Sequence, residues 1–199
     1  MNIQLFEDKL KKYVTMLNQY DTGTEPLTIS NERAYDFLKE NVPLFDCPDK
    51  NLELTYYFRW WAFRKHIKTC PDGYVITEFL PDVCWAMDYN TINMASGFHI
   101  LESRWIRTRK ITEDYINFWL NHVENSSQYT SWMFDSMYKF CLTTGSFSIL
   151  ENAVGKMIDC FQVWEDGYIF CDEFVGKKEK GLYRCPDDRD GSEISIGGV

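Results

Sequence analysis

Two segments of the chain gather residue types that carry out acid–base chemistry or recognise sugars. The first is Asp187-Asp188-Arg189-Asp190-Gly191-Ser192-Glu193, with four carboxylates and one arginine within seven residues. One carboxyl group of such a loop can act as a general acid while its neighbours hold sugar hydroxyls and tune its pKa. A solvated acidic loop is the alternative, because charge clusters are usually exposed. A calcium loop would need acids at positions 186 and 197, where Pro186 and Gly197 stand.

The second segment runs from residue 77 to residue 90 and places Trp85 among Glu78, Asp88 and Asn90. An indole face stacks on the apolar side of a sugar ring, while carboxylates and amides hydrogen-bond its hydroxyls. The alternative is that Trp85 anchors the loop to the core, since tryptophan is commonly part-buried. The sequence therefore indicates a candidate carbohydrate-binding loop.

Further polar and aromatic residues could face a cavity, namely Arg59, Trp60, Trp61, Trp132 and Asp135. For each of them taken singly, core packing beside a satisfied polar neighbour is the simpler interpretation. The same holds for His99, which we expect to be a hydrogen-bonded core residue on an apolar helix face.

Several functional classes are disfavoured by the composition and the spacing of residues. The net charge of −9 argues against a non-specific nucleic-acid binder. The three histidines and seven cysteines show no metal-ligand spacing, and there is no C-x-x-C pair. No apolar run reaches the roughly 18 residues of a membrane span, and the first residues lack a secretory pattern. We therefore expect a cytoplasmic protein with reduced cysteines and no membrane partner.

The apolar spacing predicts an all-α protein with about seven helices, because strand signals are almost absent. Residues 73–81 are expected to be a short extended piece, and Ala95-Ser96-Gly97 to permit close approach of a neighbouring helix. Long connections follow alternate helices, as in a toroid of helical hairpins with functional loops at one end. The predicted helices cover approximately residues 6–17, 30–38, 52–67, 90–107, 111–119, 133–141 and 150–161.

Three stretches together resemble the mannosylglycerate hydrolase-like glycoside hydrolases of the six-hairpin (α/α)6 superfamily, which also contains trehalases and processing α-glucosidases. The resemblance extends over about residues 50 to 199. It implies a partial (α/α)6 toroid, with N-terminal helices in residues 1–50 and the first part of a catalytic domain in residues 51–199. The stretches are Tyr56-Tyr57-Phe58-Arg59-Trp60-Trp61, then Glu78-Phe79-Leu80-Pro81 with Trp85 and Tyr89-Asn90-Thr91-Ile92, and finally residues 187–196.

This resemblance implies hydrolysis of an O-glycosidic bond by inversion, without a cofactor. It assigns the general acid to Glu193 or Asp190 and substrate holding to Asp188 and Arg189. The chemistry of the residues themselves adds Trp85, Asp88 and Asn90, with Glu78, Arg59 and Trp60, as candidates for substrate binding. The general base of the related enzymes comes from later hairpins, so we expect an incomplete domain that needs a C-terminal complementing segment or self-associates. Two alternatives stay open: a non-catalytic carbohydrate-binding or remnant protein, and a helical domain whose aromatic loops bind another protein.

Overall fold

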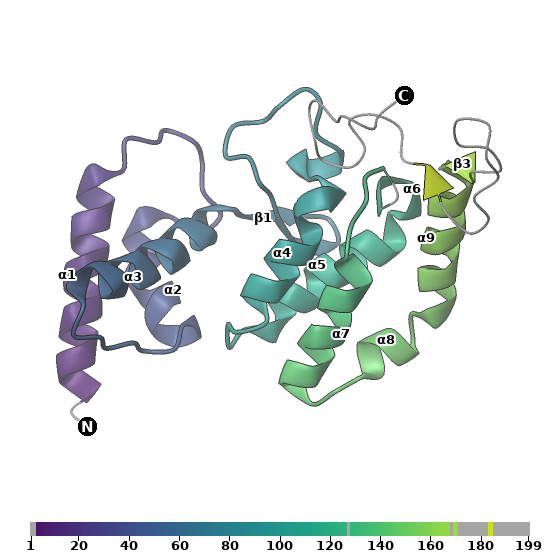
Figure 1. Ribbon diagram of the computed structural model, residues 1–199. Coiled ribbons are helices and arrows are strands. Elements are labelled where there is room, and N and C mark those ends of the chain that lie inside the picture. Colours follow the sequence, from purple (N-terminus) through teal and green to yellow (C-terminus); the bar gives the residue numbers. More distant parts are fainter. Residues whose placement is uncertain (1–2, 127, 168, 171–182, 185–199) are drawn as a thin grey trace. The chain divides into compact units, whose positions relative to one another are not determined.

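The computed structural model describes residues 3–126, 128–167, 169–170 and 183–184, and this part of the chain is mostly helical (Figure 1). The predicted all-α class is confirmed. The chain divides into two compact units, unit 1 from Met1–Thr91 with Ser103–Asp114, and unit 2 from Ile92–Glu102 with Tyr115–Val199. The helices are α1 Ile3–Tyr20, α2 Ala34–Asn41, α3 Lys50–Lys65, α4 Asn93–Ser103, α5 Arg109–Asn121, α6 Val123–Ser126, α7 Met133–Thr144, α8 Ser148–Glu151 and α9 Val154–Gly167, with 3-10 turns η1 Asn31–Arg33 and η2 Asp88–Asn90.

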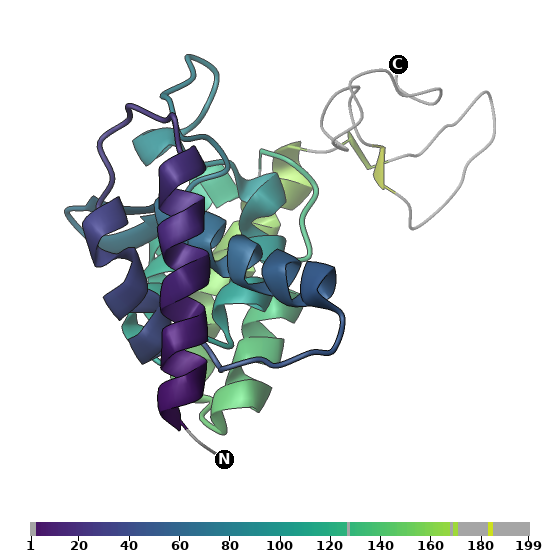
Figure 2. The same cartoon turned by 90° about the vertical axis from the view of Figure 1, so that its left-hand side faces the viewer.

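Unit 1 begins with three helices that pack against one another in all three pairs. Helix α1 buries a stripe formed by Leu10, Val14 and Leu17 against α2 and α3, as its apolar spacing predicts (Figure 2). Helix α3 starts where the carboxylate of Asp49 accepts hydrogen bonds from the backbone N–H groups of residues 51 and 52, at 2.9 and 3.2 Å.

Helix α3 is buried around much of its circumference, in keeping with its aromatic sequence. Tyr57, Trp60, Trp61 and Phe63 are all buried. The ring of Trp60 meets that of Phe63 edge to face, with centroids 5.8 Å apart. Such pairs contribute beyond their buried area, so α3 is the central element of unit 1.

Charged side chains are also buried in unit 1 and are held by hydrogen bonds and ion pairs, although the Nε of Arg64 has no partner among the described residues. The carboxylate of Glu53 accepts hydrogen bonds from the hydroxyl of Tyr13 and the backbone N–H of Cys47, both at 2.8 Å, and it pairs with Lys50 at 3.2 Å. Burial alone would raise the pKa of Glu53, but these donors lower it to about 2. Glu53 thereby ties α1, α3 and the connection before α3 together.

Two basic residues end α3 inside the same unit. The guanidinium of Arg64 donates to the backbone carbonyl of Ile29 and to Asn31 Oδ1, the latter at 2.7 Å. Lys65 Nζ lies 2.7 Å from the carboxylate of Asp21. Burial lowers the pKa of Arg64 to about 10, whereas hydrogen bonds outweigh burial at Asp21 and lower its pKa to about 2. Both basic groups also suit the negative end of the helix dipole.

A β-hairpin follows α3, and it corrects the predicted extent of that helix. The apolar pattern predicted helix to residue 67, but α3 ends at Lys65 and β1 Ile67–Cys70 pairs antiparallel with β2 Gly73–Ile76. The two-residue turn needs Gly73 at φ +124°, and a Cβ there would lie 2.3 Å from Asp114 Oδ2. The backbone N–H of Tyr74 donates to the same carboxylate at 3.1 Å. Turn chemistry therefore overrides the helical pattern at this point.

Unit 2 is built from α4, most of α5 and the helices that follow. The largest fully buried side chain in its described part is Trp119, which is packed edge-on against Tyr115 and Phe118. Helix α7 ends at Gly145, whose φ of +70° forms a left-handed cap. The predicted helix at residues 150–161 is instead two elements, because α8 ends at Glu151 and α9 begins at Val154.

The close approach predicted for Ala95-Ser96-Gly97 is present inside unit 2. A Cβ on Gly97 would lie 2.7 Å from Trp132 Nε1 and 2.8 Å from Trp132 Cδ1. The indole of Trp132 thus rests on the backbone of α4, where only a hydrogen atom fits. Among the residues that the structure describes, no helix combines the length and apolarity that a bilayer span requires.

Candidate functional site

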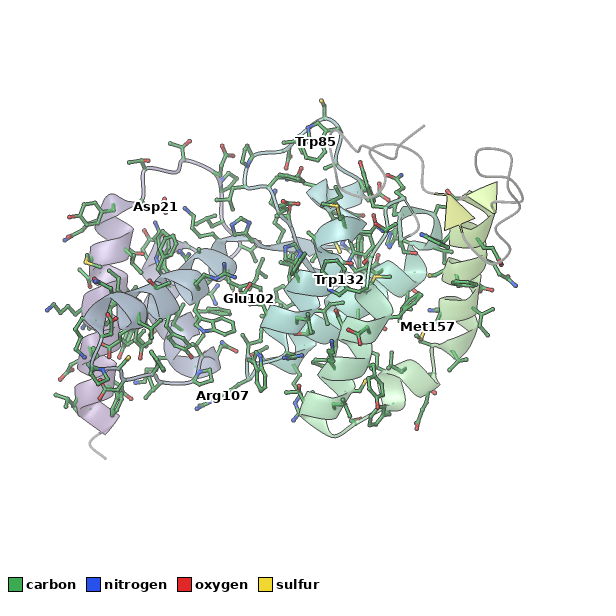
Figure 3. The ribbon with its side chains drawn as sticks, in the orientation of Figure 1. Asp21, Trp85, Glu102, Arg107, Trp132 and Met157 are labelled. Atoms are coloured by element: carbon green, nitrogen blue, oxygen red, sulfur yellow. The ribbon has the colours of Figure 1, made fainter. Side chains whose placement is uncertain are left out.

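The best-formed candidate site of unit 1 is the loop between β2 and α4, residues 77–91, which we call the aromatic loop. An antiparallel bridge between Met87 and Thr91 closes its far end. Trp85 stands on this loop at one end of the unit (Figure 3) and is 58% exposed. Its ring meets Phe79 edge to face, with centroids 4.6 Å apart. The indole is therefore held from one side and presents a free surface for stacking.

The side chain of Asn90 forms the interior of the aromatic loop. Its Nδ2 donates to the carbonyls of Phe79 and Pro81 at 3.0 and 3.1 Å, and its Oδ1 accepts from the backbone N–H of Val83 at 3.0 Å. Its own carbonyl accepts from the hydroxyl of Thr77. With both amide hydrogens used inside the loop, Asn90 mainly holds the loop in shape.

The loop also contains two adjacent residues with positive φ, Tyr89 at 56° and Asn90 at 60°. Asparagine tolerates this left-handed conformation better than most residues, whereas for a bulky residue such as tyrosine it costs free energy. The hydrogen bonds of Asn90 supply the compensation. Helix α4 begins at Asn93, three residues later than the expected start.

The residues of unit 1 that the sequence analysis assigned to substrate binding differ in their exposure and in the element that carries them. Trp85, Glu78 and Asp88 are exposed on the aromatic loop, and Asn90 is buried beneath them. Arg59 is exposed on α3. Trp60 is buried in the core between aromatic neighbours, so its assignment to substrate binding stays a prediction that its packing does not support.

The remaining predicted site residues are Glu193, Asp190, Asp188 and Arg189, and they lie outside the described residues. The hypothesis that their loop shares one cleft with Trp85 and Asp88 accordingly stays a prediction.

Unit 2 contains a second exposed aromatic group, which the sequence only partly revealed. Phe98 on α4 and Trp132 before α7 are both exposed and meet edge to face, with centroids 4.5 Å apart. Asp135 is exposed in the first turn of α7 and pairs with Lys139 at 2.6 Å. The sequence indicated Trp132 and Asp135 as candidates but not Phe98. Phe98 follows Gly97 on α4, so the predicted close approach at Gly97 was the signal that could have revealed it.

A cavity of about 210 Å³ also lies within unit 2, between α6, the start of α7 and α9. Burial raises the pKa of the Cys160 thiol on its wall, so this cysteine is a poor nucleophile there. The turn that forms another wall is fixed by Asn93, whose side chain bonds the backbone of residues 126 and 129. The remaining lining is mainly aromatic, from Tyr129, Phe134, Phe161 and Trp164.

The histidines and acidic residues were the remaining candidates for acid–base chemistry or metal binding. His99 is hydrogen-bonded to the hydroxyl of Tyr115 at 3.0 Å, as expected of a core residue. Within the described ranges, no group of three or more His, Cys, Asp or Glu side chains is arranged to hold a metal ion.

An exposed tryptophan and carboxylates on one fixed loop are typical of surfaces that bind sugars. One solved structure, described as a sialidase, matches with a TM-score of 0.84 and 32% identity over 97% of this chain. The chain spans 18% of the length of that sialidase. Comparison with curated proteins gave no match.

The family assignment follows from a second comparison. The model of the mannosylglycerate hydrolase MGH1-like glycoside hydrolase domain matches residues 88–199, more than half of the chain. The chain therefore belongs to this glycoside hydrolase family, as the sequence resemblance implied. The matched segment begins at Asp88, inside the aromatic loop, and includes the acidic loop at residues 187–193.

Proposed function

We propose that the protein hydrolyses O-glycosidic bonds and that the aromatic loop forms part of its substrate-binding surface. The observation that carries this proposal is the fixed, 58% exposed indole of Trp85 in a chain of a glycoside hydrolase family. A preset platform loses little conformational entropy when a sugar stacks on it. Glu78 and Asp88, exposed on the same loop, are suited to accept hydrogen bonds from sugar hydroxyls.

The chemical step is proposed for the acidic loop. Glu193 or Asp190 donates the proton to the leaving oxygen, and Asp188 and Arg189 hold the sugar. An inverting enzyme needs a second carboxylate roughly 6.5–9.5 Å from the acid, so that a water molecule fits between the base and the anomeric carbon. Acids within one short loop are too crowded for this geometry. We therefore propose that the base is supplied by another segment of the complete protein.

The helices of this chain are proposed to be the first hairpins of an (α/α)6 toroid. The likeness to a solved chain of which it spans 18% supports a longer protein. A group of apolar side chains in unit 2 is exposed, and we propose that they contact either a complementing helical segment or a second copy. This group consists of Tyr138, Leu142, Phe147, Val154, Ile158 and Phe161.

A reducing compartment is also proposed. Cys47, Cys70, Cys84, Cys141 and Cys160, the cysteines within the described residues, are all free thiols. Free thiols of this number suit the cytoplasm better than an oxidising environment.

The test compares Glu193→Gln and Asp190→Asn in the complete protein, with Asp187→Asn as the matched control. For an unactivated glycoside, loss of the proton donor should lower kcat by about 10²–10⁴-fold. For an activated aryl glycoside the loss should be much smaller, because its leaving group needs no proton. Equal losses on both substrates would remove that residue from the acid role.

The stereochemistry and the alternative function are tested with the same protein. Proton NMR of the first-formed product should show the inverted anomer, and retention would contradict the inverting mechanism. Saccharide binding without turnover by the complete protein would instead support the non-catalytic alternative. No binding and no turnover over a broad glycoside panel would contradict both.

A further inference from the structure

Unit 1 also contains a cavity that no residue of the aromatic loop lines. This cavity of about 370 Å³ lies between the segment before α2, one face of α2, the hairpin and the start of α5. Arg107, which directly precedes the α5 wall, and Trp85 appear at opposite ends of unit 1 in Figure 3. The cavity volume lies in the usual range of small-molecule sites, about 300–1,000 Å³.

The walls of this cavity are fixed by Asn41 and Asp114. The Oδ1 atom of Asn41 accepts from the backbone N–H of Thr108 at 3.0 Å, and its carbonyl accepts from that of Arg107 at 3.1 Å. These bonds join the end of α2 to the start of α5. The carboxylate of Asp114 joins the hairpin to α5 through the N–H of Tyr74. The cavity is therefore built from elements that cannot move independently without breaking these part-buried hydrogen bonds.

The lining has an apolar floor and a polar rim. Ile29, Phe37 and Ile111 line the cavity with less than a tenth of their surface exposed, so they form its floor. A pocket of this composition orients a ligand through a few polar groups while burying its apolar parts. The polar groups of the rim come from Arg33, Asp36, Glu40, Tyr74 and Thr108.

Three charged side chains of the rim form no hydrogen bond or ion pair with other described residues. Arg33, Asp36 and Glu40 lie on one face, at i, i+3 and i+7. Among the described residues, no hydrogen bond or ion pair involves the guanidinium of Arg33 or the carboxylate of Asp36 or Glu40. Asp36 and Glu40 form an i, i+4 pair of like charges, an arrangement that disfavours a helix when nothing bridges it. A ligand that donates hydrogen bonds to both carboxylates removes this cost.

We infer that this cavity is a saccharide-binding site for a neutral sugar of one or two rings. Sugar hydroxyls can donate to Asp36 and Glu40 and accept from Arg33, while the apolar face of the ring lies over the floor. Two carboxylates disfavour an anion such as phosphate, and the guanidinium disfavours an organic cation. The site does not depend on the proposed hydrolysis, because most of its lining precedes the segment matched by the glycoside hydrolase family.

The test measures binding of methyl α-D-glucopyranoside and maltose to the 199-residue chain by saturation-transfer NMR. The double variant Asp36→Asn/Glu40→Gln should lower the affinity by at least tenfold. Asp8→Asn/Glu25→Gln makes the same change of charge at exposed positions of unit 1 away from the cavity, and it should bind like the unaltered chain. Because Asp36 and Glu40 are exposed, both double variants should keep the melting temperature within a few degrees.

Hydrogen-exchange mass spectrometry with saturating sugar locates the site. Slower exchange is expected in peptides covering residues 33–41 and 107–111. Protection confined to residues 77–91, unchanged affinity of the Asp36→Asn/Glu40→Gln variant, or no binding of either sugar would overturn the inference. So would tighter binding of inorganic phosphate or tetramethylammonium, because each would show that the cavity selects a charged ligand.

Discussion

The two units of the chain stabilise their helices with different kinds of buried polar group. Unit 1 buries Glu53, Arg64 and Lys65 among its helices. In the described part of unit 2, the buried polar residues are neutral, namely Asn93, Ser96, Ser126 and Ser136. A buried charge is stable only with specific partners, whereas small neutral groups allow helices to approach closely. Stability in unit 1 therefore depends on protonation, and stability in unit 2 depends mainly on shape.

The largest expected effect is in the aromatic core of unit 2. Trp119→Ala should destabilise the protein by about 3–5 kcal/mol, because it leaves a cavity at a fully buried position. The indole Nε1 of Trp119 has no hydrogen-bond partner among the described residues, so Trp119→Phe removes an unsatisfied group and should cost much less. Denaturant unfolding of both variants measures the difference. Equal costs would show that shape does not dominate in unit 2.

The corresponding test in unit 1 is Glu53→Gln. It keeps the side-chain shape but removes the charge that Lys9, Lys50 and the Tyr13 hydroxyl share, and it should cost about 2 kcal/mol. Asp46→Asn is the control, because its half-exposed carboxylate contacts the same lysines. Hydrogen exchange of α1 and α3 amides should show the loss for Glu53→Gln and little change for the control. A similar loss for both would assign the stabilisation to surface pairing.

Acid pH should separate the units. The pKa values of Glu53 and Asp21 are lowered to about 2 in the folded chain. A carboxylate with a lowered folded-state pKa stabilises above its unfolded-state value of roughly 4 and loses that contribution as pH falls toward 2. Exchange protection of unit 1 should therefore decrease between pH 4.5 and pH 2 before that of unit 2. Simultaneous loss in both units would contradict the difference proposed between them.

Substitution of Asn90 tests whether buried polar hydrogen bonds also stabilise the aromatic loop of unit 1. Asn90→Gly keeps the left-handed backbone but removes three hydrogen bonds, and we expect a loss of about 1–2 kcal/mol. Asn90→Ala adds backbone strain at φ 60° and should cost about 1 kcal/mol more. Thermal melts measure both losses, and hydrogen exchange of residues 77–91 reports the loop. Unaltered exchange of these residues in both variants would show that Asn90 does not hold the loop in shape.

The smallest expected effect on stability is that of Trp85→Ala. Its indole is mostly exposed, so the free energy of unfolding should change by less than about 0.5 kcal/mol. If the loop binds substrate, the same change should raise KM at least tenfold in the complete protein. Trp105→Ala is a matched control, because Trp105 is also about half exposed in unit 1. An equal effect of the two variants on KM would remove Trp85 from the binding surface.

The spacing of apolar residues predicted most of the helices. It failed where the backbone conformation of particular residues ends a helix or reverses the chain. The apolar stripe of α1, the aromatic α3 and the close approach at Gly97 agree with the structure. The second strand of the β-hairpin lies within residues 73–81, which were expected to be extended. Its first strand was missed because Ile67 continues the apolar pattern of α3, while the conformation of Gly73 and its contact with Asp114 reverse the chain. Such long-range contacts have no local signature in a single sequence.

The sequence predicted which residues belong to the candidate loop, but it did not predict which of them face solvent and which hold the loop together. Trp85 and Asp88 are exposed as a binding loop requires, and their neighbours in sequence indicated sugar recognition. Asn90 carries the same signal, yet its amide is used inside the loop, which depends on three backbone groups brought together by folding. The cavity rim at Arg33, Asp36 and Glu40 was missed because a charged helix face usually means a solvated surface.

The contact between Gly97 and Trp132 has a consequence for the evolution of this family. Since a Cβ at position 97 would lie 2.7 Å from the indole nitrogen, position 97 cannot gain a side chain while Trp132 is kept. Related chains with alanine or a larger residue at position 97 are therefore expected to carry a smaller side chain at position 132. The two positions, 35 residues apart in sequence, should vary together across homologues. We expect the tryptophan at position 132 to be replaced before position 97 gains a side chain.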